Sequence, residues 1–219
     1  MAHRDDLELS ILWETPHELV LVKPAGMATE LTSDPNGVSL ISRIRTTFPD
    51  AKLPHRLDRV TRGLVVVART DEAIVWHNQQ IRRGEWEKTY LARVSAEANP
   101  DRLLGVHTLH LRTVRGRAEV VRSGGKQVVT EILAWAVAPD SESEAHVLIR
   151  LLTGRFHQIR ATMAHLGAPL VDDWLYGTSP GREHERFYLE HAALRFRPHG
   201  AATASIVHWR GDPEREPIA

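Results

Sequence analysis

Short segments with strand character recur along this chain, and they restrict its fold more than any other feature. Residues 64–68, Leu-Val-Val-Val-Ala, form a continuous apolar run, as expected of a strand that is buried on both faces. Ser123-Gly124-Gly125 predicts a hairpin turn between two of the other strands, 117–122 and 127–137. The full set of further predicted strands is 19–22, 86–94, 106–114, 117–122, 127–137, 145–152, 187–196 and 203–209.

Helical periodicity is confined to a few stretches. The apolar residues of 38–48 recur at helical spacing, and 70–84 predicts a helix capped by Thr70. A further helix is predicted within 155–167, with Phe156 on its apolar face. Many strands joined mostly by turns, with few helices between them, indicate an α+β fold around a mixed, largely antiparallel sheet with flanking helices.

The composition is that of an ordinary globular protein. The chain has 219 residues without a repeat or long linker, so we expect a single domain over 1–219 with its core at about 16–210. It has no cysteine, which excludes disulfides, thiolate metal sites and a cysteine nucleophile. No apolar run approaches the length of a membrane span, and the first residues do not resemble a signal peptide. These features predict a cytoplasmic protein without a membrane partner.

The distribution of charge is more informative than its sum. The 28 basic and 28 acidic residues give a formal net charge of zero, which argues mildly against a nucleic-acid partner. However, residues 145–171 contain no acid, and 112–126 contain Glu119 as their single acid. A neutral protein with such basic stretches can still bind a polyanion locally. The basic residues of the second stretch are Arg112, Arg115, Arg117, Arg122 and Lys126.

The polar segment 55–63, His-Arg-Leu-Asp-Arg-Val-Thr-Arg-Gly, directly precedes the predicted buried strand. Asp58 lies between Arg56 and Arg59, and nearby positive charge favours the ionised carboxylate. An ionised carboxylate beside a buried strand is a candidate catalytic group. For the segment taken alone, a surface turn of salt bridges is the simpler interpretation.

Two further segments combine polar side chains with regular structure. Residues 151–160, Leu-Leu-Thr-Gly-Arg-Phe-His-Gln-Ile-Arg, run from a strand into a helix, where His157 and Arg160 are neighbours on the surface. Arg160 borders the apolar face and could reach inward to a carboxylate, although an exposed polar face is the simpler interpretation. Tyr90 shares a face with Lys88 on a predicted strand, where a half-buried, hydrogen-bonded tyrosine is the usual case.

Taken together and in order, these segments resemble the RluA-type family of RNA pseudouridine synthases from about Leu19 to Phe196. One such match would be weak, but the series is specific. The matching segments are Val22-Lys23-Pro24-Ala25-Gly26, residues 55–69, Lys88-Thr89-Tyr90, residues 153–160, residues 165–170, Tyr176-Gly177 and residues 189–192.

The resemblance implies a pseudouridine synthase catalytic fold, with a mixed sheet in two halves and an RNA-binding cleft between them. It implies that Asp58 is the catalytic carboxylate, that Tyr90 is the active-site tyrosine and that Arg160 is the arginine that pairs with the carboxylate. It suggests that Arg56 fills the stack from which the target base has left. Substrate contacts are expected from His55, Arg56, Arg59, Thr61, Arg155, His157 and Gln158.

The implied reaction is the isomerisation of uridine to pseudouridine, which requires no cofactor and no metal. The expected partner is structured ribosomal or transfer RNA, bound by a monomer that has no separate N-terminal RNA-binding domain. We expect Arg112, Arg115, Arg117, Arg122 and Lys126 to contact RNA phosphates. The sequence departs from the family pattern at Val60, Arg62, Phe156 and Asp172.

Two other functions remain open from the sequence. A metal-dependent hydrolase or nuclease could use His157, His165, Asp172 and Asp173, but these residues have no recognised ligand spacing. A catalytically silent RNA-binding relative could use the same fold as a clamp. The presence of Asp58, Tyr90 and Arg160 argues against the silent relative.

Overall fold

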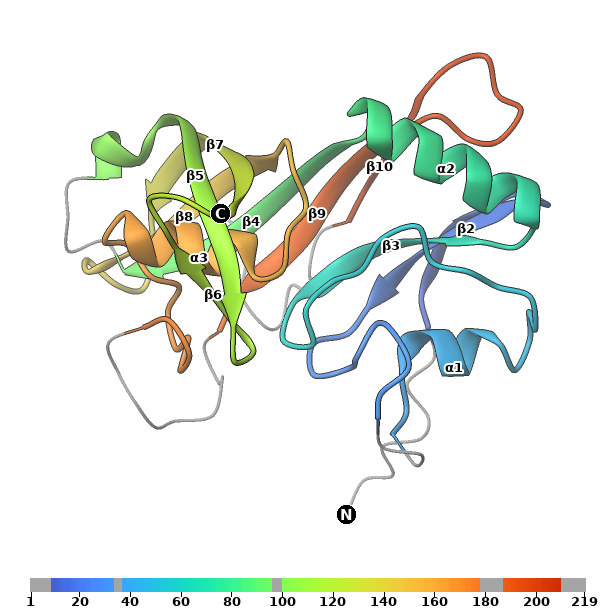
Figure 1. The fold of residues 1–219 in the computed structure, drawn as a ribbon, viewed down its shortest axis with the longest axis horizontal. Helices are drawn as coiled ribbons and strands as arrows, with labels where there is room; N and C mark the ends of the chain where they lie inside the picture. Colours follow the sequence, from blue (N-terminus) through green and yellow to red (C-terminus); the bar gives the residue numbers. More distant parts are fainter. Residues whose placement is uncertain (1–8, 34–36, 96–99, 178–186, 210–219) are drawn as a thin grey trace. The chain divides into compact units, whose positions relative to one another are not determined.

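The structure is a computed structural model that describes residues 9–33, 37–95, 100–177 and 187–209 (Figure 1). The chain divides into two compact units. Unit 1 comprises Met1–Glu85 and Arg195–Trp209, and unit 2 comprises Trp86–Leu194 and Arg210–Ala219. No helix in the described ranges is long and apolar enough to cross a membrane.

Unit 1 is built around an antiparallel meander of β1 (Ile11–Glu14), β2 (Glu18–Lys23) and β3 (Arg62–Ala68). Every residue of β2 is buried, and so is β3 from Gly63 onward, which explains their nearly continuous apolar sequences. Lys23 pairs with Gly63 at the end of this ladder, so the buried lysine lies beside the loop that precedes β3. Unit 1 also contains α1 (Leu40–Ile44), α2 (Asp71–Arg83) and β10 (Ser205–His208).

Helix α2 matches its sequence prediction. The Thr70 side chain accepts a hydrogen bond from the Ala73 amide, and Gly84 ends the helix in the left-handed conformation with φ +70°. Asp71 and Glu72 occupy the first turn, where the positive end of the helix dipole favours acids. The helix packs along β3 (Figure 1).

Unit 2 contains a larger antiparallel sheet with the strand order β9-β4-β8-β7-β5-β6. Helix α3 (Gln158–His165) packs against β6 and β7, and a single turn of 3-10 helix precedes β5. The strands are β4 (Glu87–Ser95), β5 (Gly105–Val114), β6 (Arg117–Val120), β7 (Lys126–Val137), β8 (Glu144–Leu151) and β9 (Leu189–Phe196), of which β9 enters unit 1 at Arg195.

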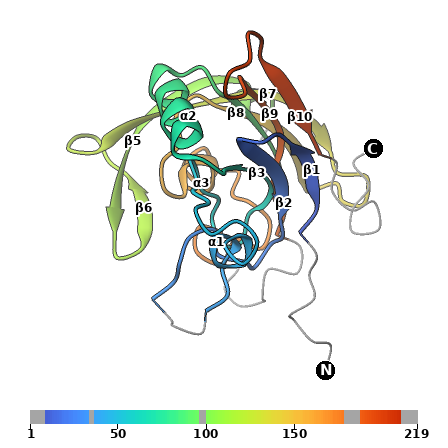
Figure 2. The same ribbon diagram turned by 90° about the vertical axis from the view of Figure 1, so that its right-hand side faces the viewer.

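The predicted hairpin turn at 123–125 is wrong. Strand β5 pairs with both β6 and β7, so these two strands lie on opposite sides of β5. The hairpin is instead formed by β5 and β6, and it lies at one edge of the sheet (Figure 2). Its turn contains Arg115 with φ +46° and Gly116 with φ +77°, the left-handed pair that a tight hairpin requires.

The α+β class with a largely antiparallel sheet is confirmed, and most predicted strands are present within two residues of their expected ends. Two helices begin later than their apolar patterns suggested, because Val38 and Phe156 are exposed rather than buried. Strand β1 was not predicted, since it is short and largely exposed. The structure has two compact units, and whether they fold as one domain, as the sequence predicts, is not tested by this division.

Candidate active site

In unit 1, the backbone around Asp58 is held by a buried threonine. The Thr29 hydroxyl accepts a hydrogen bond from the Leu57 amide at 3.1 Å and donates one to the Leu57 carbonyl at 2.7 Å. Asp58 is the next residue, and its carbonyl accepts a hydrogen bond from the Thr61 amide at 3.0 Å. Asp58 is only partly buried. The loop therefore presents this carboxylate on a backbone that is fixed on both sides.

Lys23 binds the same loop through its backbone carbonyls. Its side chain is fully buried, and Nζ donates to the carbonyls of Pro24 and Met27 at 2.8 Å each and to that of Arg59 at 3.3 Å. Gly26 and Arg59 add a reciprocal connection, because the Gly26 amide donates to the Arg59 carbonyl and Arg59 Nε donates to the Gly26 carbonyl. Gly26 has φ +83°, which explains glycine at this turn. The lysine thus joins the 24–27 turn to the Asp58 loop.

Burial lowers the pKa of Lys23 from 10.5 to about 7; the charge of Asp58 opposes this shift, and that of Arg59 adds to it. Between these two values the unfolded chain binds more protons than the folded chain. The free energy of unfolding should therefore rise as the pH increases from about 7 to 10.5; this gain is lost again as the pH falls from 10.5 to about 7, below which Lys23 adds no further slope. Its slope is at most about 1.4 kcal/mol per pH unit.

Lys23→Met should remove this slope, which urea unfolding at pH 7, 8 and 9 can measure. The matched control is Lys52→Met, which removes a surface ammonium from the same unit. If both variants keep the wild-type dependence on pH, the ammonium of Lys23 does not lose its proton in the folded protein.

The remaining predicted residues of this loop have different surroundings. Arg56 is exposed and forms an ion pair with Glu30. The Nε2 atom of His55 accepts a hydrogen bond from the Val66 amide at 2.9 Å, so this histidine ties the loop to β3. Thr61 is buried. Of the predicted substrate contacts on this loop, Arg56 and Arg59 are therefore the exposed ones.

In unit 2, Gln158 organises the polar segment that precedes α3. Its Oε1 accepts from the Thr153 hydroxyl at 2.8 Å and from the Arg155 amide at 3.1 Å. Its Nε2 donates to the Val129 carbonyl at 3.1 Å and to the Thr130 hydroxyl at 3.0 Å. The side chain is buried and its amide is fully hydrogen-bonded. Gln158 therefore supports the loop from within, whereas Arg155 is exposed, and substrate contact by either residue stays a prediction.

Arg160 is directed inward. Only 3% of its surface is exposed, so it does not belong to an exposed polar helix face. Nε and Nη2 donate to the two carboxylate oxygens of Asp173 at 2.8 and 2.7 Å, in the bidentate geometry that suits a guanidinium. Asp173 also accepts hydrogen bonds from the amides of Leu175 and Tyr176. The carboxylate that Arg160 reaches in this unit is thus Asp173.

His157 and Tyr176 complete the surroundings of Arg160. His157 Nε2 lies 3.3 Å from Arg160 Nη1, and its Nδ1 lies 3.0 Å from the Tyr176 hydroxyl. The Tyr176 hydroxyl also accepts a hydrogen bond from the Ala118 amide of β6 at 2.7 Å. Phe156 stacks on the His157 ring with 3.7 Å between centroids. The segment before α3 is therefore bound to the edge of the sheet through these two residues.

Tyr90 lies on β4, opposite Ile149 of β8. It is buried, and its ring is stacked on that of His191 with 4.6 Å between centroids. Lys88 lies two residues earlier on the same strand, and burial lowers the pKa of its ammonium. Its Nζ lies 3.0 Å from the position that a Cβ at Gly154 would occupy. Glycine at this point of the 153–160 segment therefore leaves room for the lysine.

The predicted RNA-contacting residues Arg112, Arg115, Arg117, Arg122 and Lys126 are all exposed. Three of them, Arg112, Arg115 and Arg117, belong to the β5–β6 hairpin (Figure 2). Arg117 differs from the others because its guanidinium lies 4.9 Å from the centre of the Tyr176 ring. We refer to residues 112–126 as the basic segment.

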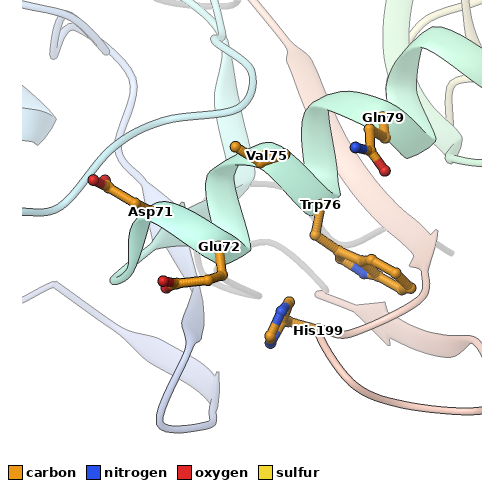
Figure 3. A pocket seen from close by; sticks show the side chains of 6 residues that line it. All are labelled: Asp71, Glu72, Val75, Trp76, Gln79 and His199. Carbon is orange, nitrogen blue, oxygen red and sulfur yellow. The ribbon is translucent and has the colours of Figure 1, made fainter.

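A separate hollow of about 410 Å³ lies on α2 in unit 1 (Figure 3). It is lined by Asp71, Glu72, Val75, Trp76, Gln79 and His199. None of the predicted site residues borders it. Its acidic rim is unsuited to RNA phosphates, so this hollow is not part of the predicted site.

The residues proposed for a metal-dependent reaction do not form a common ligand set. Within the described ranges, no three histidine, aspartate or glutamate side chains are grouped so that they could hold a metal ion. Both oxygens of Asp173 already accept hydrogen bonds from Arg160, and His165 is exposed. The metal-dependent interpretation therefore has no support from this geometry.

Comparison with known proteins decides the family. The RNA pseudouridylate synthase family matches residues 17–165 of this chain. The chain is 32% identical over 201 residues to the dual-specificity RNA pseudouridine synthase RluA of Escherichia coli strain K12. The aligned region covers 91% of each protein. This chain belongs to the RNA pseudouridylate synthase family. Its enzyme class is therefore that of the isomerases, as the sequence predicted.

Other relatives agree with this family assignment. The chain is 33% identical over 182 residues to the ribosomal large subunit pseudouridine synthase D of Pseudomonas aeruginosa, and the aligned region covers 78% of this chain and 54% of that protein. The human RNA pseudouridylate synthase domain containing 1 has 26% identity and a TM-score of 0.73, covering 94% of this chain and 84% of the other. The human domain containing 4 shares the fold with a TM-score of 0.72 at 18% identity, over 95% of this chain and 89% of the other.

Two departures of the synthase from its family pattern have a structural context. Where the resemblance implies a glycine, Asp172 has φ +54°, a conformation that glycine adopts freely and that aspartate tolerates better than most residues. Where the resemblance implies a small residue, Phe156 is 38% exposed and stacks on His157. Nothing in the structure explains the departures at Val60 and Arg62.

Sequence reasoning missed several residues that hold the site. Lys23 and Tyr176 lay in segments that matched the family, but no role was given to them. His191 also lay in such a segment, 189–192, whereas Thr29 had no distinguishing signal. Asp173 was noted only as a possible metal ligand, although an acid a short distance after a buried arginine could have suggested an ion pair.

Proposed function

We propose that this synthase isomerises selected uridines of structured ribosomal or transfer RNA to pseudouridine, with Asp58 as its essential carboxylate. The observation that carries the proposal is the position of Asp58 on a loop of the family-matching segment, pinned by the buried Lys23 and Thr29. A carboxylate that starts a reaction must be held in one orientation. The loop meets that requirement.

The reaction breaks the bond between C1′ of the ribose and N1 of uracil, turns the base, and joins C1′ to C5. The hydrogen of C5 is then lost as a proton, and N1 gains one, so atoms and electrons balance without a cofactor. In our proposal Asp58 supplies the carboxylate that initiates cleavage. Tyr90 takes part in the removal of the C5 proton. Arg160 supplies a fixed positive charge to the reacting groups.

A uridine within folded RNA must leave its stack before it can react, which costs a few kcal/mol. We assign Arg56 to the vacated position, because its planar guanidinium can stack on bases and bind their edges. Its exposure is consistent with this role, and its partner in the free protein is the exposed Glu30. A surface ion pair of this kind is weak enough to exchange for RNA.

The basic segment is proposed to grip RNA phosphates. Replacing Arg112, Arg115 and Arg122 together with glutamine should reduce the log–log salt dependence of RNA binding by roughly 2 to 3. Turnover at saturating RNA should change little, because phosphate contacts position the substrate rather than react with it. A filter-binding titration from 50 to about 300 mM salt measures the slope.

Arg43→Gln, Arg45→Gln and Arg83→Gln together are the matched control, since they remove the same charge from the helices of unit 1. The slope of this control should stay at the wild-type value. An equal loss of slope in both triple variants would show that the basic segment acts only through the total charge of the protein.

Mapping pseudouridines in cells with and without this gene tests the proposed function and names the target. Specific positions in ribosomal or transfer RNA should lose pseudouridine and regain it when the purified protein is added. The same RNA incubated with and without chelator distinguishes the alternatives, because a metal-dependent nuclease would cut strands and a silent relative would bind without product. We further propose that the protein is a monomer, which sedimentation of the purified protein can test, and that it is cytoplasmic, which fractionation of cells can test.

A further inference from the structure

The guanidinium of Arg160 is surrounded by the Asp173 carboxylate and by the rings of His157 and Tyr176. This arrangement determines which nitrogen of His157 carries the proton. A guanidinium can only donate hydrogen bonds, so His157 Nε2, at 3.3 Å from Nη1, must be the unprotonated ring nitrogen. The proton of the neutral ring is therefore on Nδ1, which donates to the Tyr176 hydroxyl oxygen at 3.0 Å. The same oxygen accepts the Ala118 amide at 2.7 Å. Hydrogen bonds thus connect Arg160 through His157 and Tyr176 to the edge of β6, and those from His157 and Ala118 converge on the Tyr176 oxygen.

His157 is held in a conformation that the chain would not choose by itself. It has φ +52° at the N-cap of α3, and its side chain does not cap the helix. Left-handed conformations are uncommon outside glycine, although asparagine, aspartate and histidine adopt them more often than other residues, and they persist where surrounding contacts determine them. Here those contacts are Phe156, Tyr176 and Arg160. The ring is consequently fixed on three sides.

Packing and cation–π contacts hold the Tyr176 ring in addition to the hydrogen bonds of its hydroxyl group. Its ring belongs to an apolar cluster with Leu111, Val128 and Ala161. The guanidinium carbons of Arg160 and Arg117 lie 5.1 and 4.9 Å from its centre, within range of cation–π attraction. Burial raises the pKa of its hydroxyl, so the group stays protonated at neutral pH. The ring therefore offers a neutral, stationary surface to Arg160.

The next residue, Gly177, explains how Tyr176 keeps this position. Its amide donates to the Asp173 carbonyl at 2.6 Å, and a Cβ at this point would lie 2.7 Å from that oxygen. No side chain fits there without moving Asp173, the ion-pair partner of Arg160. The Tyr176-Gly177 pair is thus built into the turn that presents Asp173.

We propose that His157 and Tyr176 are positioning residues that hold the guanidinium of Arg160 in one orientation for the isomerisation. The inference deepens the proposed function and rests on it. Asp173 fixes two nitrogens of the guanidinium, and His157 with Tyr176 fixes the third nitrogen and the plane. If these two residues had a purely structural role, their substitution would lower stability without a specific loss of kcat.

The test uses RNA labelled with tritium at C5 of uridine, because forming the new bond at C5 releases this label. Ribosomal and transfer RNA transcripts serve as probes, and kcat and KM are measured separately. Tyr176→Phe keeps the ring and removes the hydroxyl, and His157→Asn removes the ring but tolerates the left-handed backbone. Both variants should lower kcat by about 10- to 100-fold with KM changed less than about threefold, since small displacements of a reacting group are costly.

Tyr188→Phe is the matched control, because it removes a buried tyrosine hydroxyl of the same unit that donates to Glu190 at 2.9 Å. Its melting temperature should fall about as much as that of Tyr176→Phe, but its kcat should stay at the wild-type value. A kcat that follows melting temperature in all three variants would overturn the positioning role. If Tyr176→Phe does not fold, the comparison of kcat with melting temperature for His157→Asn against Tyr188→Phe tests the positioning role.

A second readout does not depend on activity. Nitrogen-15 NMR of labelled histidine, assigned by comparison with His157→Asn, should show His157 as the neutral tautomer protonated at Nδ1. Protonation at Nε2 instead would contradict the hydrogen-bond chain whatever the activity. If the wild-type protein forms no pseudouridine in any transcript but shows the Nδ1 tautomer, the chain of contacts stands and the proposed function fails. The two failures are therefore distinguishable.

Discussion

Changing Asp58 to asparagine is expected to lower pseudouridine formation by at least about a thousandfold while RNA affinity stays within a few-fold of wild type. Asparagine has nearly the same shape but has neither the negative charge nor the nucleophilicity of a carboxylate. The loop should keep its conformation, because Thr29 and Lys23 bind its backbone rather than the Asp58 side chain. Release of tritium from C5-labelled RNA and a binding titration measure the two quantities.

The protein itself offers a control for this substitution. Asp50→Asn removes an exposed carboxylate from the same unit and should leave turnover unchanged. In Asp58→Asn the pKa of Lys23 should fall further, because the charge of Asp58 normally raises it. The variant should nevertheless remain folded at neutral pH, because Thr29 and Lys23 still bind the loop backbone, and circular dichroism can verify this. Appreciable pseudouridine formation by the purified variant would remove Asp58 from the mechanism.

The sequence predicted the fold well wherever local chemistry and burial act together. Helix α2 is an example, since Thr70, the acids of its first turn and Gly84 each favour the same boundaries. Strand β3 is another, because its apolar run has no other stable environment than a buried position. In both cases the residues within the element contain enough information to define it.

Sequence reasoning failed where the partner of a segment decides its structure. The Ser123-Gly124-Gly125 segment has good turn chemistry, yet β6 and β7 both pair with β5 instead of with each other. Arg115-Gly116 forms the hairpin turn, and an arginine with positive φ is not a residue that turn statistics favour. Pairing between strands depends on contacts across the sheet, which composition within one segment does not encode.

In the candidate site, too, some features follow from the residues of one segment, and others depend on a partner elsewhere in the chain. Spacing alone allowed Arg160 to be either an exposed helix residue or an inward-facing one, and the choice depends on Asp173, which lies beyond the end of the helix. Gln158 was expected to contact substrate because it lies in a polar motif, but its four hydrogen bonds connect backbone and side chains of the protein. Polar residues in a matched motif thus include both reacting groups and the residues that support them.

Breaking the ion pair between Arg160 and Asp173 is the second change with a large expected effect. Arg160→Met should abolish most turnover and destabilise the protein by roughly 3 to 5 kcal/mol, because it leaves the buried Asp173 carboxylate without its counter-charge. Arg160→Lys should rescue poorly, since an ammonium lacks the planar fork that binds both oxygens. Urea unfolding and the tritium-release assay measure the two losses separately.

A double variant separates the structural role of Arg160 from its role in the reaction. In Arg160→Met with Asp173→Asn, the buried negative charge is gone, and the side-chain carbonyl oxygen of the introduced asparagine can still accept the amides of Leu175 and Tyr176. Stability should therefore recover by more than half of the loss in the single variant, because replacing a buried ion pair by neutral groups is often tolerated. Turnover should stay as low as in Arg160→Met, because no positive charge has been restored. Recovery of both quantities in the double variant would mean that Arg160 serves only to neutralise Asp173.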